Sequence, residues 1–217
     1  MNIESKNPPQ VSIDTVSSAL IVIDMQRAFL ETGPLELPGG HKIVKGIERL
    51  IKKCRELGIV VVFTRIFHDD MTHSVYPELF PDHFDQKGNP RLTKKSPSFQ
   101  ITSELQPTKS DIIIDKSRYS AFYKTKLESI LFEKEARTLI VVGLATNVCC
   151  ESTARDAFFR NFRVVVVSDL CATYDTRAHE ASLDNIRNCF GFVVNSKQMN
   201  EMLSQTKTNN AQKQALS

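Results

Sequence analysis

The feature of this sequence that most constrains its fold is a set of six short apolar runs, rich in β-branched residues, that end in polar residues. Runs of this length and composition are typical of strands buried on both faces of a sheet. The expected strands are Ala19–Asp24, Ile59–Thr64, Asp111–Asp115, Thr138–Val142, Val164–Ser168 and Phe192–Asn195.

Between several of these runs lie patterns with helical periodicity. The expected helices are His41–Leu57, Thr125–Glu135, Asn147–Asn161 and Arg177–Cys189. Gly58 follows the first of them, where the glycine that ends a helix belongs. Strands and helices in alternation predict an α/β fold, with a mostly parallel sheet and helices on both of its faces.

A length of 217 residues suits one domain with a sizeable core. We expect a flexible arm at residues 1–16, one folded domain at residues 17–203 and a flexible polar tail at residues 204–217. The connection formed by residues 66–110 is unusually long and contains five prolines. Because loops of that length are usually functional or disordered, we expect this one to cover the active site.

Composition excludes several classes of protein. The formal net charge is only +3, and no concentrated basic stretch predicts a nucleic-acid partner. The longest apolar runs are far shorter than a membrane span, and the polar N-terminus lacks the apolar segment of a secretory signal. The cysteines number five and show no C-x-x-C spacing, which indicates free thiols in a reducing compartment. We therefore expect a cytoplasmic protein without nucleic-acid or membrane partners.

In an open parallel sheet the ligand lies beyond the carboxyl ends of the strands. That rule directs attention to the residues that end the expected strands, which are Asp24, Thr64, Lys116, Gly143–Cys149 and Asp169. Asp24 suits a proton shuttle, although an aspartate that caps a turn is the alternative. Lys116 would hold a carboxylate ionised and favour a thiolate, and its alternative is a solvated lysine at a strand end.

Cys149 lies at the expected turn from a strand into a helix. The positive end of the helix macrodipole would lower the pKa of its thiol, and the unpaired N–H groups of the first turn would hold an oxyanion. The alternative is a small buried hydrophobic residue, which is the role we expect for Cys54, Cys150 and Cys189. Nucleophile, base and cation would each follow a different strand, an arrangement typical of nucleophilic catalysis.

Three segments resemble the isochorismatase-like cysteine hydrolases, namely Val22–Phe29, Asp115–Phe122 and Gly143–Ala157. The resemblance covers about residues 17–195 and is nearest to members of the ureidoacrylate amidohydrolase type. It implies a Rossmann-like three-layer α/β/α fold with about six mainly parallel strands. It also implies a catalytic triad formed by Asp24, Lys116 and Cys149, and an assembly into a homodimer or homotetramer.

The resemblance further implies a cis peptide bond at Leu144–Ala145, which would aim the N–H of Ala145 at the oxyanion beside that of Cys149. The implied activity is hydrolysis of the C–N bond of a small amide, ureido or carbamoyl compound through a thioester, with release of ammonia or an amine and without a cofactor. A nicotinamidase or an isochorismatase-type ether hydrolase is an alternative. A catalytically silent binding or scaffold protein is an alternative of another class.

A metal site is not expected. Nicotinamidases usually carry an Asp-x-His metal motif after the second strand, and Ile66 stands here where that aspartate would be. His68, Asp69 and His73 are the residues nearby that could in principle bind a metal.

The residues expected to bind the substrate are Gln26, Phe29, Arg118, Tyr119, Phe122 and Asn147. Arg118 would pair with a carboxylate, the three rings would wall a small planar pocket, and the two amides would hydrogen-bond a urea group. The alternatives are a surface arginine at an interface, core packing for the rings, and helix N-capping for Asn147.

Overall fold

The protein is described by a computed structural model that covers residues 12–31, 33–68 and 75–214, with side chains through residue 205. The expected arm at residues 1–16 therefore lies mostly outside the described residues. In the described part of the chain, no helix combines the length and the apolar character needed to cross a membrane.

The centre of the fold is one sheet of six strands, all parallel, in the order β3-β2-β1-β4-β5-β6. The strands are β1 (Ser18–Ile23), β2 (Val60–Ile66), β3 (Ile112–Lys116), β4 (Thr138–Leu144), β5 (Arg163–Ala172) and β6 (Phe192–Val194). Each of them coincides with one of the predicted apolar runs. Every residue of the two central strands, β1 and β4, is buried, which is why their sequences are apolar almost without interruption.

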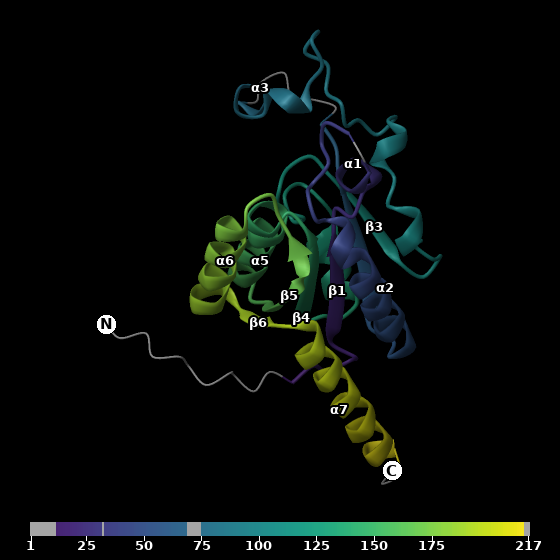
Figure 1. The fold of residues 1–217 in the computed structure, drawn as a ribbon. Coiled ribbons are helices and arrows are strands. Elements are labelled where there is room, and N and C mark those ends of the chain that lie inside the picture. The colour runs from purple at the N-terminus through teal and green to yellow at the C-terminus, as the bar shows by residue number, and fades with distance from the viewer. Residues whose placement is uncertain (1–11, 32, 69–74, 215–217) are drawn as a thin grey trace, which may run out of the picture.

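Helices cover both faces of this sheet (Figure 1). On one face lie α2 (His41–Glu56) and α7 (Ser196–Gln214). The other face carries α4 (Leu127–Glu133), α5 (Glu151–Phe159) and α6 (Thr176–Asn185). The predicted three-layer α/β/α architecture is confirmed.

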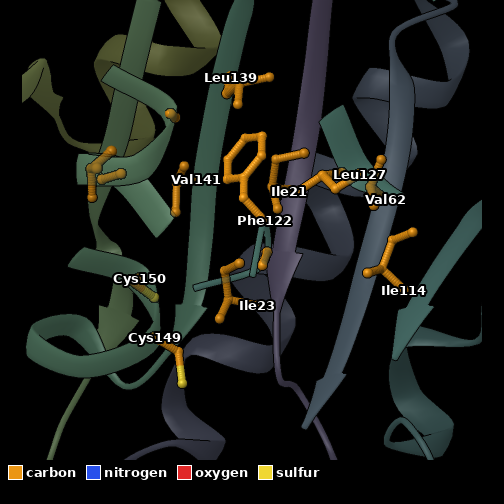
Figure 2. Close-up of a cluster of buried hydrophobic side chains, with 14 of the residues drawn as sticks. Ile21, Ile23, Val62, Ile114, Phe122, Leu127, Leu139, Val141, Cys149 and Cys150 are labelled. Carbon is orange, nitrogen blue, oxygen red and sulfur yellow. The ribbon is translucent and has the colours of Figure 1, made fainter. Parts of the chain in front are cut away.

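The core consists of two clusters, one on each face of the sheet. Along β1, Ile21 and Ile23 face the α4–α5 side, while Leu20 and Val22 face the α2 side. Burying one such side chain completely stabilises the fold by about 1.5–3 kcal/mol. Figure 2 shows the first cluster, with Phe122 lying over the central strands.

Two of the predicted helices have an irregular turn at one end. The helix predicted to start at Asn147 begins instead with the π-helical turn η4 (Thr146–Cys150), which leads into α5. The helix α6 ends in a second such turn, η5 (Ile186–Phe190). Cys189 lies in this second turn and is exposed, so its expected core position was wrong. At the C-terminus, α7 extends to Gln214, so most of the predicted tail has a helical backbone.

The connection between β2 and β3 consists of short elements. They are α3 (Tyr76–Leu79) and the 3-10 turns η1 (Pro81–His83), η2 (Pro97–Phe99) and η3 (Ser103–Leu105). Each of α3, η1 and η2 has a proline at its first or second position, where the missing N–H costs no hydrogen bond. The short helix α1 (Arg27–Leu30), which follows β1, lies against η2.

Candidate functional site

The three expected catalytic residues lie together at one edge of the sheet. Asp24 follows β1, Lys116 ends β3, and Cys149 lies in η4, just beyond the end of β4. Figure 2 shows the Cys149 side chain past the tips of the central strands. The connections from β1 and β4 leave toward opposite ends of the sheet, so this is the topological switch point at which open α/β sheets bind ligands.

Asp24 and Lys116 form a buried ion pair. The Lys116 Nζ lies 2.6 Å from Oδ2 of Asp24, and the two side chains are 0% and 2% exposed. The other carboxylate oxygen, Oδ1, accepts a hydrogen bond of 2.6 Å from the Thr64 hydroxyl, which in turn accepts one from the Asp24 N–H. Both oxygens therefore have partners, as a buried charge requires. Asp24 itself has a φ of 47°, in the left-handed region that aspartate tolerates better than most residues.

Cys149 is the third member of this group. Its thiol lies within hydrogen-bond range of both the Asp24 carboxylate and the Lys116 ammonium group, and the residue is 6% exposed. Burial raises the pKa of the Cys149 thiol to about 12. The positive charge of Lys116 lowers this pKa, but the negative charge of Asp24 opposes that effect. The expected lowering of this pKa was wrong. The thiol of Cys149 is therefore neutral at physiological pH.

Lys116 stays charged in this buried position. Burial alone lowers the pKa of its ammonium group, but the interactions with the Asp24 carboxylate and the Cys149 side chain outweigh that effect, so the pKa is raised above 10.5. The Nζ also donates to the carbonyl of Arg118 at 3.2 Å. Lys116 therefore holds a fixed positive charge beside the carboxylate and the sulfur.

The end of β4 approaches β1 unusually closely. At Gly143, where φ is 118°, a Cβ atom would lie 2.1 Å from the Ile23 carbonyl oxygen, so only glycine fits. The pairing of β4 with β5 also shifts register beside this residue. The peptide bond between Leu144 and Ala145 is cis, at the position that the family resemblance implies.

The turn η4, which carries Cys149, is attached to α6. The Thr146 hydroxyl shares a hydrogen bond of 2.8 Å with Nδ1 of His179, and the Ser182 hydroxyl donates to the Thr146 carbonyl at 3.2 Å. Inside the turn, the carbonyl of Ala145 accepts the N–H groups of the two residues that flank Cys149 in the sequence. These bonds fix the backbone around the nucleophile.

Gln26 has a different role from the one expected. Its side chain is fully buried, and its Nε2 donates to the carbonyls of Ile66 and Phe99 at 3.1 and 3.0 Å. Its Oε1 accepts the N–H of Ile66 at 2.7 Å. With both donors engaged by the chain itself, Gln26 anchors the β2–β3 connection and is not placed to bind a urea group.

Three other residues that the sequence singled out have partners within the protein. Phe122 is 5% exposed and packs in the core against Phe162, so the alternative of core packing holds for this ring. Asn147 lies inside η4 and accepts from the Thr173 hydroxyl at 2.6 Å; it caps no helix. The Asp169 carboxylate accepts hydrogen bonds from the N–H and the hydroxyl of Ser196 and fixes the start of α7.

Tyr119, another of the expected substrate residues, lies in an aromatic cluster. Tyr119 contacts Tyr76 of α3, with 6.0 Å between ring centroids. Burial raises the pKa of both phenols and of Tyr174, and the electrostatic influence of Cys149 acts in the same direction in each case. Tyr76 belongs to the β2–β3 connection, and the expectation that this connection covers the active site stays a prediction.

Arg118 and Phe29 are both half-buried. The Nη1 of Arg118 donates to the carbonyl of Ser117 at 2.7 Å, and Phe29 packs at the junction of the two core clusters. Neither contact tests a role in substrate binding, so both assignments stay predictions.

The residues named for a metal are only partly described. Asp69 and His73 lie outside the described residues. Within the described ranges, no group of three or more His, Cys, Asp or Glu side chains is arranged to hold a metal ion. The Ile66 side chain, at the position of the nicotinamidase aspartate, is buried in the core.

Sequence reasoning did not assign roles to Thr64, Tyr76, Tyr174 and His179. Thr64 had a signal, since it was expected to end a strand beside Asp24. Tyr76 had none, because the β2–β3 connection lacks any periodic pattern. His179 would have required knowledge of how α6 packs on η4.

Comparisons with known proteins agree with this geometry. Residues 18–198 match the model of the isochorismatase domain family. The chain is 33% identical over 224 residues to the ureidoacrylate amidohydrolase RutB of Acinetobacter baylyi, with 92% of this chain and 91% of that protein covered. It is 38% identical over 208 residues to RutB of Yersinia enterocolitica, with 86% and 89% covered.

Among solved structures, a cysteine hydrolase from Pseudomonas syringae pv. phaseolicola superposes with a TM-score of 0.85 at 29% identity, covering 94% of this chain and 100% of that one. Fold, site and sequence thus agree, and the chain belongs to the isochorismatase family of hydrolases.

Proposed function

We propose that this protein is a cysteine amidohydrolase that cleaves the C–N bond of a small ureido, carbamoyl or amide compound through a thioester on Cys149. The observation that carries the proposal is the position of the Cys149 thiol, within hydrogen-bond range of both members of the buried Asp24–Lys116 pair. Similarity to ureidoacrylate amidohydrolases favours ureido compounds within this class.

The first step is the transfer of the thiol proton to Asp24. Because the pKa of the thiol is raised to about 12, the thiolate is formed as the nucleophile attacks rather than stored beforehand. The sulfur forms a bond to the carbonyl carbon, and the electron pair of the C=O bond moves to oxygen. Lys116 keeps its positive charge and stabilises the negative charge as it moves from the Asp24 carboxylate to the sulfur.

The oxyanion then requires hydrogen-bond donors. We assign the backbone N–H groups of Ala145 and Cys149, which belong to the turn that carries the nucleophile. One such donor typically contributes about 2.7–4 kcal/mol to transition-state stabilisation. The ties of Thr146 to α6 hold this turn in place before the substrate arrives.

Protonated Asp24 next gives its proton to the leaving nitrogen, and the C–N bond breaks with release of ammonia or an amine. The thioester remains on Cys149. Asp24 then takes a proton from water, which attacks the thioester, and the thiol is restored with that proton. Apart from the substrate and one water molecule, the groups assigned to these steps are side chains and backbone N–H groups of this chain, and the acyl group leaves as a carboxylic or carbamic acid.

Substitution of the nucleophile tests the proposal. We expect Cys149→Ala and Cys149→Ser each to lower kcat/KM by about 10⁴-fold or more, since removing a nucleophile disables the whole catalytic unit. Ammonia release from N-carbamoylglycine, nicotinamide and a simple aliphatic amide is the measurement. Mass spectrometry of acid-quenched wild-type enzyme should show the acyl group on the Cys149 peptide.

The adjacent Cys150 offers a matched control. It is fully buried in the core, so Cys150→Ala should keep turnover within about threefold of the wild type. Undiminished turnover in both Cys149 variants would rule out the thioester mechanism. Preference for nicotinamide would replace the ureido class by the nicotinamidase alternative.

A further inference from the structure

The chain between β3 and α4 is held in place by side chains. Residues 117–122 form neither a helix nor a strand, so no ladder of backbone hydrogen bonds locates them. Ser120 lies in the middle of this segment and is half-buried. Its hydroxyl donates to Oδ2 of Asp156 at 2.5 Å and accepts the N–H of Phe122 at 3.2 Å. The serine therefore joins its own segment to α5, the helix that follows the nucleophile.

A second bond joins the same two elements. The N–H of Ala121 donates to the Thr153 hydroxyl at 3.0 Å, and Thr153 is a fully buried residue of α5. The next residue in the segment, Phe122, packs against Phe162 and lies over the central strands (Figure 2). Two hydrogen bonds and a buried ring thus attach the segment to α5 and to the core.

The Asp156 carboxylate is itself held in place. Its Oδ1 accepts a hydrogen bond from Nη1 of Arg160 at 2.9 Å, four residues further along the chain. Arg160 also donates through Nε to Glu128 of α4 at 3.1 Å. One carboxylate oxygen is therefore bound by Arg160 while the other faces Ser120. Hydrogen bonds to a charged group are stronger than those between neutral groups, so the bond to Ser120 suits a locating role.

The segment reaches the catalytic group through a backbone carbonyl. The carbonyl of Arg118, two residues before Ser120, accepts a hydrogen bond from Nζ of Lys116 at 3.2 Å. An ammonium group has three N–H donors, and Asp24 accepts another of them at 2.6 Å. The Lys116 side chain is fully buried, where an N–H without a partner costs free energy. The position of the Arg118 carbonyl therefore contributes to the direction in which the ammonium group points.

We propose that Ser120 and Asp156 are positioning residues for the reaction, which hold this segment so that its carbonyl orients the ammonium group of Lys116. The inference rests on the function proposed above and goes beyond it, because both residues act through the segment and not by contact with the substrate. The nucleophile and the lysine then share one support. The helix α5 continues directly from the turn that carries the nucleophile, and it also holds the segment that follows β3.

The variant Ser120→Ala tests the assignment, because it removes the hydroxyl and little else. We expect kcat for N-carbamoylglycine to fall about tenfold with KM changed by less than about threefold, since a displaced catalytic group lowers the rate more than the affinity. The rate of iodoacetamide labelling at Cys149 at pH 9 should fall about threefold, because the charge of Lys116 lowers the pKa of that thiol. A labelling rate equal to that of the wild type would overturn the proposal, as would an unchanged kcat.

Ser196 provides a matched control. Its hydroxyl donates to Oδ2 of Asp169 at 2.6 Å, which is nearly the same bond as that of Ser120, but it lies at the start of α7. Both alanine variants should lower the melting temperature to a similar extent, whereas only Ser120→Ala should change kcat and the labelling of Cys149. Equal changes in both variants would show that lost stability causes them and would overturn the proposal.

Two variants of Asp156 extend the test. Asp156→Asn keeps a hydrogen-bonding atom opposite Ser120 and should retain kcat within about threefold of the wild type, whereas Asp156→Ala should match Ser120→Ala. The double alanine variant should be no slower than either single variant, since both changes remove the same bond. Additive losses would show that the two residues act separately and would overturn the proposal.

The labelling measurement also separates this inference from the proposed function. It needs no substrate, so it reports on Lys116 and Cys149 whichever compound the enzyme cleaves. Turnover that survives in Cys149→Ala would refute the thioester mechanism, while slower labelling in Ser120→Ala would still support the positioning role. Unchanged labelling in Ser120→Ala, together with hydrolysis that depends on Cys149, would overturn the positioning role alone.

Discussion

Cys149 combines a nucleophilic atom with an environment that keeps it protonated. The sulfur is buried beside an ion pair whose opposite charges largely offset one another at that position. Burial therefore decides the charge state of the thiol, and its reactivity depends on how directly Asp24 can accept the proton. A stored thiolate would be open to oxidation and alkylation, whereas a neutral thiol reacts only when the substrate is in place.

The pH dependence of alkylation tests this assignment. We expect the rate of iodoacetamide labelling at Cys149 to rise about tenfold per pH unit from pH 7 to 10, because the thiolate fraction rises that way below a pKa of about 12. Peptide mass spectrometry gives the rate. At pH 7 the exposed Cys189 should be labelled faster. A rate at Cys149 that levels off below pH 9 would contradict the raised pKa.

The sequence predicted the residues of the site better than their environments. Asp24, Lys116 and Cys149 were identified because each follows an apolar run, and parallel strands bring their carboxyl ends to one edge. The pKa of Cys149 was predicted in the wrong direction, because it depends on burial by segments far away in the chain. Gln26 and Phe122 occur within the recognised segments, but sequence does not show which neighbours their side chains meet.

At the scale of the element, the end of β4 packs unusually closely against a neighbouring strand. Gly143 packs against the β1 backbone, and the pairing of β4 shifts register there before the chain enters η4. The extra residues of this shift lie in β5, between Val166 and Cys171, and the pairing resumes at Gly143 and Leu144. This close contact between two central strands, together with the hydrogen bonds from α6, positions the turn that carries Cys149.

Replacement of this glycine should disrupt the element. We expect Gly143→Ala to lower the free energy of unfolding by more than about 3 kcal/mol, because the added Cβ would collide with the Ile23 carbonyl at a φ that also disfavours alanine. Gly58→Ala is the control, since Gly58 has a φ of 73° but no atom within 4 Å of the added Cβ. It should cost about 1–2 kcal/mol. Equal losses in urea denaturation would show that backbone conformation alone matters.

The strands were predictable, whereas the short irregular elements were not. The four inner strands β1, β2, β4 and β5 are largely buried and the edge strands β3 and β6 are buried in part, and all six carry apolar runs that identify them. The turns η4 and η5 interrupt helical periodicity only slightly, so their sequence pattern does not differ from that of the helices they adjoin. The helix α7 extends beyond residue 203 with a polar sequence that lacks an apolar stripe, and periodicity therefore gave no signal there.

At the scale of the whole molecule, stability depends on buried groups that stay neutral. Burial raises the pKa of the Cys54 thiol to about 12, as it does for Cys149, while it lowers the pKa of His68 to about 3. Between pH 9 and 12 the unfolded chain loses thiol protons that the folded chain keeps, so stability falls as pH rises. Between pH 6.5 and 3 the unfolded chain binds a proton that His68 in the folded chain does not, so stability falls as pH decreases.

We therefore expect stability to be highest between about pH 6.5 and 9 as far as these groups decide it. At pH 10 each thiol should have lost about 1.4 kcal/mol of its contribution, since that value corresponds to one pH unit above the ordinary pKa. Urea denaturation at a series of pH values gives the profile. Cys54→Ala should weaken the alkaline decline and leave the acidic decline unchanged. An unchanged alkaline decline would show that Cys54 does not titrate as described.

The strand order has a consequence for how the enzyme loses activity. Lys116 lies at the end of β3, an edge strand that is hydrogen-bonded only to β2. Opening of sheet edges by local fraying requires less free energy than global unfolding. Detachment of this one border strand would remove the ammonium group from its two neighbours while the rest of the sheet remains folded. Inactivation in mild denaturant would then precede the cooperative transition, and the attachment of β3 would set the highest denaturant concentration at which the protein is active.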